Sequence, residues 1–383
     1  MATFELVLPG KIVFGVGASA ELGTRAASLG SRALVVTGKE PLRQQPLIDG
    51  LEAAGVAVIS FCVGHEPTVE DVKRGTDIAR GPGCDLVVSI GGGSVLDTGK
   101  AIAALLSNPG DVMEYLEVIG DGKPLTTMPV PHVAVPTTAG TGSEATKNAV
   151  LLSEKHAVKV SMRSPFMVPT IALVDPDLTQ SMPRSVTVSS GLDALTHLLE
   201  SYVSLRANPL VDPFCEDGIR RAARSLQRAA ADGDDLDSRL DMSLASLYGG
   251  IVLANAGLGA VHGFAGVLGG RLHVPHGLAC GCLLAPVFDA NISAAEAANA
   301  PVLPRFARVA RWLTRDSDAN PRAAVTWLFD LTESLGVPSL SDYGLIADMY
   351  EGICEGALRS SSMKGNPIPL DRAELARILA RAA

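Results

Sequence analysis

The stretch that decides the fold is Asp85–Leu106, with the sequence DLVVSIGGGSVLDTGKAIAALL. It begins with a continuous apolar run, Asp85–Ile90, which is typical of a strand buried on both faces. The run leads through Gly91-Gly92-Gly93-Ser94 into apolar residues at helical spacing, Ser94–Leu106. A buried strand, a glycine turn and a helix in this order predict one β–α unit of a parallel sheet, with an anion site at the start of the helix.

Similar units are repeated on both sides of this stretch, up to about residue 182. Further strands are predicted at Arg32–Thr37, Val56–Val63, His132–Val135 and Ile171–Val174, with a helix at Val69–Arg80. Later residues show only Ala- and Leu-rich helical patterns: Val186–Leu205, Pro213–Ala231, Arg239–Gly257, Pro301–Thr314, Pro321–Leu335 and Asp371–Ala382. We therefore expect an α/β dinucleotide-binding domain with a Rossmann-like parallel sheet over residues 1–182. An all-α domain that binds metal and substrate is expected over residues 183–383.

Composition excludes several classes of protein. The 383 residues are 47% hydrophobic and carry a formal net charge of −9, so neither disorder nor nucleic-acid binding is expected. The six cysteines form no CxxC pair and no signal peptide precedes the first strand, which favours the cytoplasm with free thiols. The uncharged stretch 242–270 is long enough to span a membrane. Its eight glycines instead favour a buried helix, so no membrane association is expected.

Three loops have the composition of phosphate sites. The turn at 91–94 is one, and the hydroxyl-rich loop Pro136–Glu144, PTTAGTGSE, is a second anchor for a phosphate or a ribose. Residues Gly15–Ala20, GVGASA, match the dinucleotide fingerprint G-x-G-x-x-[GA]. This third loop is the weaker candidate, because the next predicted strand ends at Thr37-Gly38 without the acidic residue that the fingerprint calls for.

One aspartate and three histidines have the chemistry of a metal site. Asp193 and His197 are four residues apart in GLDALTHLLE, so they project from one helix face. His262 lies in GLGAVHG and His276 in HVPHG. Each has an ordinary structural explanation alone, but together they suit one divalent cation with a position left for substrate. Cys280-x-Cys282 is a less favoured metal pair, because its spacing is too short for a usual zinc site.

Taken together, these motifs resemble the iron-containing (group III) alcohol dehydrogenase family over essentially the whole chain. The resemblance implies a metal-dependent, NAD(P)-linked dehydrogenase or reductase that transfers hydride between a nicotinamide and a small alcohol or aldehyde, at a cleft between the domains. It implies Fe²⁺, alternatively Zn²⁺, on Asp193, His197, His262 and His276. It implies that NAD(H) or NADP(H) contacts Gly92, Gly93, Ser94, Asp97, Thr137, Thr138, Thr146, Lys159 and Leu178. A homo-oligomer, a dimer or higher, is also expected.

Two departures from the family pattern concern cofactor choice and proton transfer. Gly38 stands at the cofactor position where many members carry an Asp that binds the ribose, and Lys39 and Arg43 follow, so NADP(H) is expected to be tolerated or preferred. Gly266 stands where many members carry a histidine, and His273 is the candidate proton relay in its place, with a chain of water molecules as the alternative.

The same fold also carries other chemistry. The alternatives are a glycerol dehydrogenase-like, a maleylacetate reductase-like or a hydroxy-acid dehydrogenase activity, or a non-catalytic nucleotide-binding protein. The last of these predicts broken metal or phosphate motifs, and both motifs are intact here.

Overall fold

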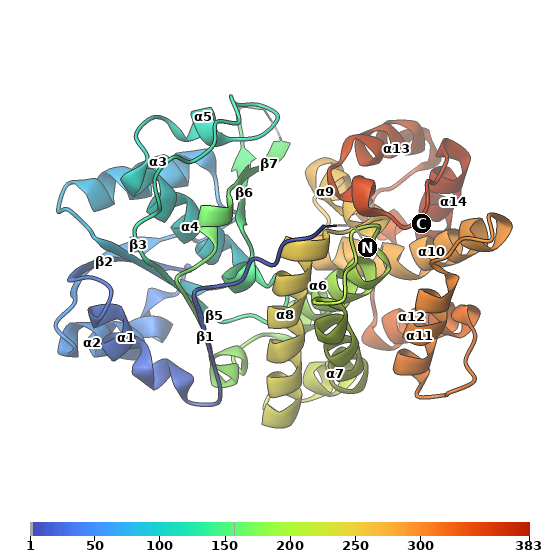
Figure 1. Cartoon of the computed structure of the whole chain (residues 1–383), viewed down its shortest axis with the longest axis horizontal. Coiled ribbons are helices and arrows are strands. Elements are labelled where there is room, and N and C mark those ends of the chain that lie inside the picture. The colour runs from blue at the N-terminus through green and yellow to red at the C-terminus, as the bar shows by residue number, and fades with distance from the viewer. Residues whose placement is uncertain (1–2, 157) are drawn as a thin grey trace. The chain divides into compact units, whose positions relative to one another are not determined.

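The computed structural model describes residues 3–156 and 158–383 (Figure 1). Its contacts divide the chain into two compact units, Val7–Ser181 and Met182–Ala383, and residues 3–6 group with the second. The first is an α/β unit and the second is helical, as the sequence predicts.

The α/β unit is built on a parallel sheet. Its six strands lie in the order β1-β8-β5-β4-β2-β3 and all neighbours are parallel. The strands are β1 Lys11–Phe14, β2 Arg32–Thr37, β3 Ala57–Cys62, β4 Leu86–Gly91, β5 His132–Pro136 and β8 Ile171–Val174. Each residue of β4 and β5 is buried, which explains why these strands are continuous apolar runs rather than alternating ones.

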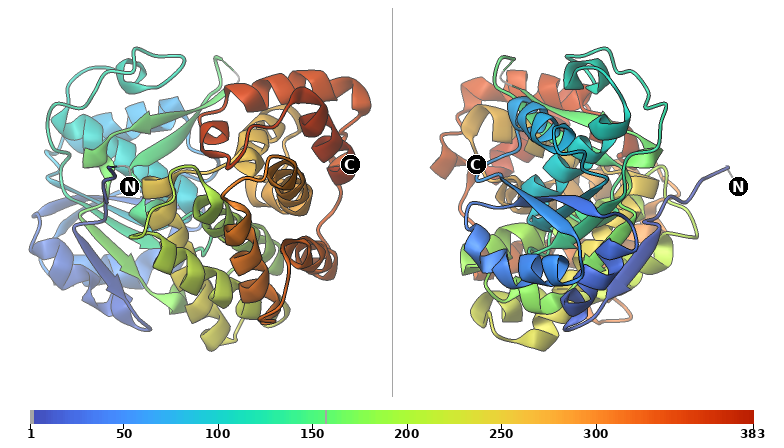
Figure 2. Two further views of the ribbon diagram at one scale, coloured as in Figure 1. Left: turned by 45° about the vertical axis from the view of Figure 1, so that its right-hand side comes forward. Right: turned by 90° about the vertical axis from the view of Figure 1, so that its left-hand side faces the viewer.

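Helices cover both faces of this sheet (Figure 2). Short helices α1 (Leu22–Ala27) and α2 (Gln45–Ala53) contribute Leu22 and Leu51 to the core on one face. On the other face, α3 (Val69–Arg80) and α4 (Gly93–Ser107) belong to a separate core. That second core also takes in α5 (Val112–Tyr115) and the antiparallel hairpin of β6 (Asn148–Ser153) and β7 (Val158–Arg163).

The strand order reverses between β2 and β4, which is the place where open parallel sheets bind ligands. From β2 the chain moves outward to β3, then returns to β4 on the other side of β2. Thr37 pairs with Ile90, so the carboxyl ends of the two strands lie side by side. Gly38 and the glycine turn after β4 therefore leave the sheet at the same edge.

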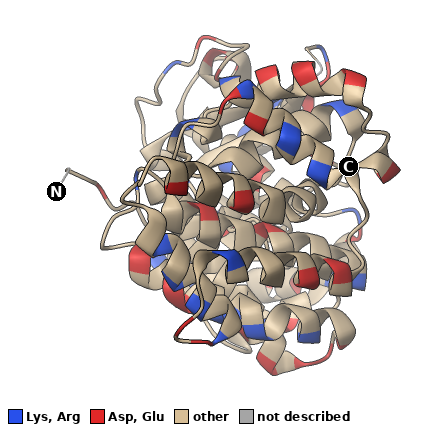
Figure 3. Cartoon of the chain, turned by 90° about the vertical axis from the view of Figure 1, so that its right-hand side faces the viewer, with Lys and Arg blue, Asp and Glu red and all other residues tan. Residues whose placement is uncertain are grey.

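The second unit consists of helices around its own core. They are α6 Arg184–Val203, α7 Asp212–Ala231, α8 Leu236–Ala256, α9 Ala260–Leu272, α10 His276–Ala297, α11 Leu303–Thr314, α12 Pro321–Leu335, α13 Tyr350–Arg359 and α14 Arg372–Ala382. Lys, Arg, Asp and Glu are interspersed along the outer helices (Figure 3). Helix α6 is almost entirely buried from Gly191 onward, and it carries Asp193 and His197 in the interior of the unit.

The sequence predicts one buried helix in the uncharged stretch 242–270. This prediction is wrong, because the stretch forms parts of two helices. Helices α8 and α9 meet at a bend of 104°. The break lies at Gly257-Leu258-Gly259, where Gly257 has φ 68°, a conformation that favours glycine. Helix α10 is long and apolar enough to cross a membrane, but 67% of its most apolar window is buried inside the protein, as in a core helix.

Candidate active site

The two predicted phosphate loops lie against each other. A methyl group added at Gly93 would approach Thr141 Cγ2 to 2.7 Å, and one added at Gly92 would approach Thr138 Cγ2 to 3.3 Å. Gly92 is the N-cap of α4, so the free N–H groups of the helix start face the hydroxyl-rich loop. The pair forms a cradle of N–H and hydroxyl donors with the positive end of a helix dipole beneath it. Thr141 was not among the predicted cofactor-binding residues.

Asp97 and Thr146 support this cradle from within the protein. The Asp97 Oδ1 atom accepts from Ser143 Oγ at 2.6 Å, and Oδ2 accepts from the Val150 N–H at 2.9 Å. The ammonium group of Lys100 is fully buried, lies 3.2 Å from Asp97 Oδ1 and donates to Thr146 Oγ1 at 2.7 Å. Burial lowers the pKa of Lys100, and the charge of Asp97 opposes that shift. These bonds hold the loop of residues 137–146 against α4.

The other predicted cofactor residues are spread along the same unit. Thr137 follows β5 and its N–H donates to the Gly91 carbonyl at 2.9 Å, which ties the two loops together. Ser94 lies in the first turn of α4, and Leu178 lies in the turn after β8. Lys159 lies on β7 and forms an ion pair with Glu66. Their contacts with a nucleotide stay predictions.

The fingerprint-like loop Gly15–Ala20 already holds an anion from the protein itself. The Asp175 carboxylate accepts from the Gly17 N–H at 3.0 Å and from the Ser19 N–H at 2.9 Å. A carboxylate therefore takes the donors that a pyrophosphate would use. The loop also follows the edge strand β1, away from the reversal of strand order.

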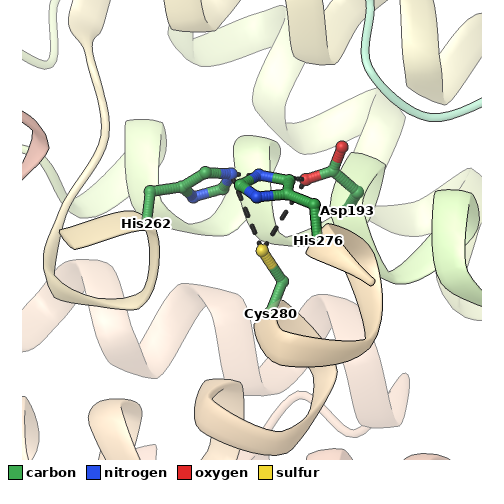
Figure 4. Close-up of side chains that lie close together, drawn as sticks. All are labelled: Asp193, His262, His276 and Cys280. Atoms are coloured by element: carbon green, nitrogen blue, oxygen red, sulfur yellow. Dashed lines mark hydrogen bonds and ion pairs between the residues drawn. The ribbon is translucent and has the colours of Figure 1, made fainter. Parts of the chain in front are cut away.

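The helical unit brings together the aspartate and the three histidines, and Figure 4 shows Asp193 with two of them, His262 and His276. Asp193 Oδ1 lies 3.3 Å from His262 Nε2, 3.5 Å from His197 Nε2 and 3.6 Å from His276 Nε2. The rings of His197 and His262 stack with centroids 4.7 Å apart. Helices α6, α9 and α10 thus bring three imidazole nitrogens within 3.6 Å of one carboxylate oxygen.

These separations fit a tetrahedral divalent ion. Ligand atoms about 2.1 Å from a tetrahedral metal stand about 3.4 Å apart. The observed 3.3–3.6 Å lies at that value and is longer than most N–H···O hydrogen bonds. Burial disfavours the charged form of Asp193, but His197, His276 and His262 together hold its pKa well below the usual range. The surrounding imidazoles therefore favour the ionised form of the carboxylate.

Glu200 orients one of the histidines. Glu200 was not among the site residues predicted from the sequence. His262 Nδ1 lies 2.7 Å from Glu200 Oε2 and donates to that carboxylate, while Nε2 on the other side of the ring faces Asp193. The same carboxylate accepts from the Val261 N–H at 2.7 Å, at the start of α9. Glu200 is seven residues after Asp193 on α6. This spacing of two helical turns is longer than the i, i+4 spacing by which Asp193 and His197 were predicted.

Close helix packing places the third histidine. A methyl group added at Gly277 would lie 1.9 Å from the Ser189 carbonyl oxygen, so α10 contacts the backbone of α6 directly beside His276. The His276 side chain is 44% exposed, whereas the side chains of Asp193 and His262 are 5% and 6% exposed. The site is therefore accessible from the side of His276. Met363 packs against α9 at the residue after His262, because its Cε would lie 3.1 Å from a methyl group added at Gly263.

The predicted relay residue His273 lies in the connection between α9 and α10. It is exposed and has a left-handed backbone, φ 55°. Within the described residues, no hydrogen bond or ion pair of His273 to the four proposed ligands is found. Gly266, one turn after His262, has nothing within 4 Å of the position that a Cβ would take.

Comparison with known proteins gives the class of this fold and site. A family model for iron-containing alcohol dehydrogenases matches residues 9–176, and a model of that family's C-terminal region matches residues 187–383. The chain belongs to the iron-containing alcohol dehydrogenase family, and it is an oxidoreductase that acts on CH–OH groups. The family predicted from the sequence motifs is thereby confirmed.

Individual relatives cover nearly the full chain. Choline dehydrogenase of Bacillus subtilis is 35% identical over 96% of this chain and 92% of its own. A solved 1,3-propanediol oxidoreductase matches with a TM-score of 0.93 at 33% identity, covering 100% of both chains. A sulfoacetaldehyde reductase from Bifidobacterium kashiwanohense, solved in complex with NAD⁺, matches with a TM-score of 0.90 at 27% identity, over 99% of this chain and 98% of its own.

Replacing Glu200 tests whether its hydrogen bond to His262 raises the affinity of the site for a metal ion. Glu200→Gln keeps the size of the side chain but removes its charge, so we expect the affinity for Zn²⁺ to fall about 10–100-fold. Competition with a chromogenic chelator measures the affinity, and far-ultraviolet circular dichroism checks the fold. The control is Glu333→Gln, an exposed glutamate on α12. Equal affinity in wild type and Glu200→Gln would show that His262 needs no such partner.

Proposed function

We propose that this chain is a metal-dependent, NAD(P)-linked dehydrogenase of a small alcohol, or reductase of the matching aldehyde. Asp193, His197, His262 and His276 are proposed to hold the ion. The observation that carries the proposal is the set of distances from Asp193 Oδ1 to the three imidazole nitrogens, 3.3–3.6 Å. The helical unit is accordingly the proposed metal and substrate domain, and the α/β unit is the proposed nucleotide domain.

The chemistry divides between the bound groups and the protein. When bound, the ion supplies a Lewis acid for the substrate oxygen, and the nicotinamide exchanges hydride with the substrate carbon. The imidazoles around Asp193 lower the pKa of its carboxyl group, and Glu200 orients the His262 ring through Nδ1. The buried environment strengthens these interactions and limits water, with access left on the side of His276.

The α/β unit supplies the proposed dinucleotide site. Gly92, Gly93 and Ser94 are proposed to hold the pyrophosphate at the start of α4, with Thr137 and Thr138 facing them. Asp97 and Thr146 position that loop, and Lys159 and Leu178 lie farther along the site. The NAD⁺ complex of the bifidobacterial relative and the reversal of strand order at β2 and β4 support this assignment.

The residues after β2 support use of NADP(H) in addition to NAD(H). Gly38 brings no carboxylate to the edge where a ribose is expected, and the exposed Lys39 follows it. Arg43 is paired with Glu40 at 2.6 Å, so Lys39 is the stronger candidate to meet a 2′-phosphate.

The cellular setting is part of the proposal. All six cysteines are free thiols, which supports a reducing cytoplasm.

Strand β1 is an edge strand, and Phe4, Leu6 and Leu8 just before it are each 37–38% exposed, which supports a homo-oligomer of at least two copies. Sedimentation velocity tests this point, and a monomer at micromolar concentration would contradict it.

A reconstitution assay tests the function. Metal-free protein is loaded separately with Fe²⁺ and with Zn²⁺ and assayed on short alcohols, 1,3-propanediol, glycerol, a 2-hydroxy acid and the matching aldehydes, with each nicotinamide. We expect metal-dependent turnover of a small alcohol or aldehyde and use of both NADH and NADPH. Absence of metal-dependent turnover on every substrate contradicts the function. A strong preference for NADH contradicts the NADP(H) proposal alone.

We infer that His273 relays protons in place of the residue missing at Gly266. His273→Gln is expected to lower kcat and to change its pH profile, because glutamine keeps the polarity but cannot accept and pass on a proton. The metal content should stay the same, which separates a relay from a structural role. An unchanged rate and pH profile would exclude His273 from proton transfer.

A further inference from the structure

A cysteine lies within ligand distance of the proposed metal site. Cys280 is four residues after His276 on α10, so both side chains project from one face of the helix. Its Sγ is buried, 3.7 Å from Asp193 Oδ1 and 3.8 Å from His262 Nε2. Figure 4 shows the thiol beneath the two imidazoles and directed toward the carboxylate.

These distances match those between ligands of one ion. A thiolate binds Zn²⁺ at about 2.3 Å and a nitrogen or oxygen ligand at about 2.1 Å, which sets the two donors about 3.6 Å apart in a tetrahedral site. Asp193, His262, His276 and Cys280 each offer a donor atom, and the four atoms lie within 4.8 Å of one another. His197 Nε2 also lies 3.5 Å from Asp193 Oδ1. The site therefore offers five donors, of which a tetrahedral ion uses four at most.

We propose that Cys280 is a metal ligand of this chain, and that Cys280 and His197 are alternative fourth ligands beside Asp193, His262 and His276. The inference rests on the proposed metal site and adds a donor to it. Binding through Sγ releases the thiol proton to solvent and adds one negative charge next to the ion. A thiolate is a soft ligand, so it shifts the preference of the site from Fe²⁺ toward Zn²⁺.

The neighbouring Cys282 provides a matched control on the same helix. Its Sγ donates to the Pro338 carbonyl oxygen at 3.1 Å, so it is directed to a different contact from that of Cys280. Burial raises the pKa of Cys282 to about 12, which keeps it a thiol. Replacing either cysteine by serine makes the same chemical change in helix α10, at the metal site or away from it.

X-ray absorption at the zinc edge tests the proposal. Wild type, Cys280→Ser and Cys282→Ser are loaded with one equivalent of Zn²⁺. We expect a sulfur scatterer at about 2.3 Å in wild type and Cys282→Ser, beside nitrogen and oxygen at about 2.0–2.1 Å, and none in Cys280→Ser. The share of Zn²⁺ bound from an equimolar mixture with Fe²⁺ should also fall in Cys280→Ser.

The outcomes separate this proposal from the function on which it rests. A wild-type shell of nitrogen and oxygen alone, with one zinc bound, overturns the role of Cys280 and leaves the metal site intact. A sulfur scatterer that persists in Cys280→Ser overturns it as well. Failure of wild type to bind one zinc overturns the proposed metal site itself. The spectra of wild type and Cys282→Ser decide the question even if Cys280→Ser does not fold, because a sulfur scatterer that is retained in Cys282→Ser does not come from Cys282.

Discussion

A buried carboxylate, Asp193, lies among three imidazoles and a thiol in the helical unit, and the packing around it serves to keep it there. Removing a carboxylate from water is costly unless positive charge compensates it. The three histidines satisfy that need in part, since they hold the pKa of Asp193 low. The proposed divalent ion would supply the remaining positive charge.

This requirement explains the unusual backbone around the site. Helix α9 starts after a bend of 104° from α8, and Glu200 contacts both the start of α9 and the His262 ring. Helix α10 lies close enough to α6 that only a glycine fits at 277. The small residues of this region thus allow close approach of three helices, and the approach brings the ligands together.

Regular patterns were predictable from the sequence, and spatial relations were not. The strands at 32–37 and 171–174 and the helices at 69–80 and 321–335 end where their residue patterns end, because burial and capping are local signals. Glu200 was not predicted, and Cys280 was considered only as a metal pair with Cys282, because the contacts of both residues depend on how α6, α9 and α10 cross. The predicted helix Arg239–Gly257 ends within one residue of the end of α8, but the turn into α9 was not predicted, because the glycines were taken to permit close packing only. The loop at 15–20 looked like a nucleotide site since Asp175, which fills it, is distant in sequence.

The central claim is that one divalent ion is held by Asp193 and the histidines of α6, α9 and α10. Diffraction at the absorption edge of zinc, from crystals grown with Zn²⁺, tests this directly. We expect one anomalous peak per chain, about 2.0–2.2 Å from Asp193 Oδ1 and from His262 Nε2. No peak there, or a peak bound by other residues, would contradict it.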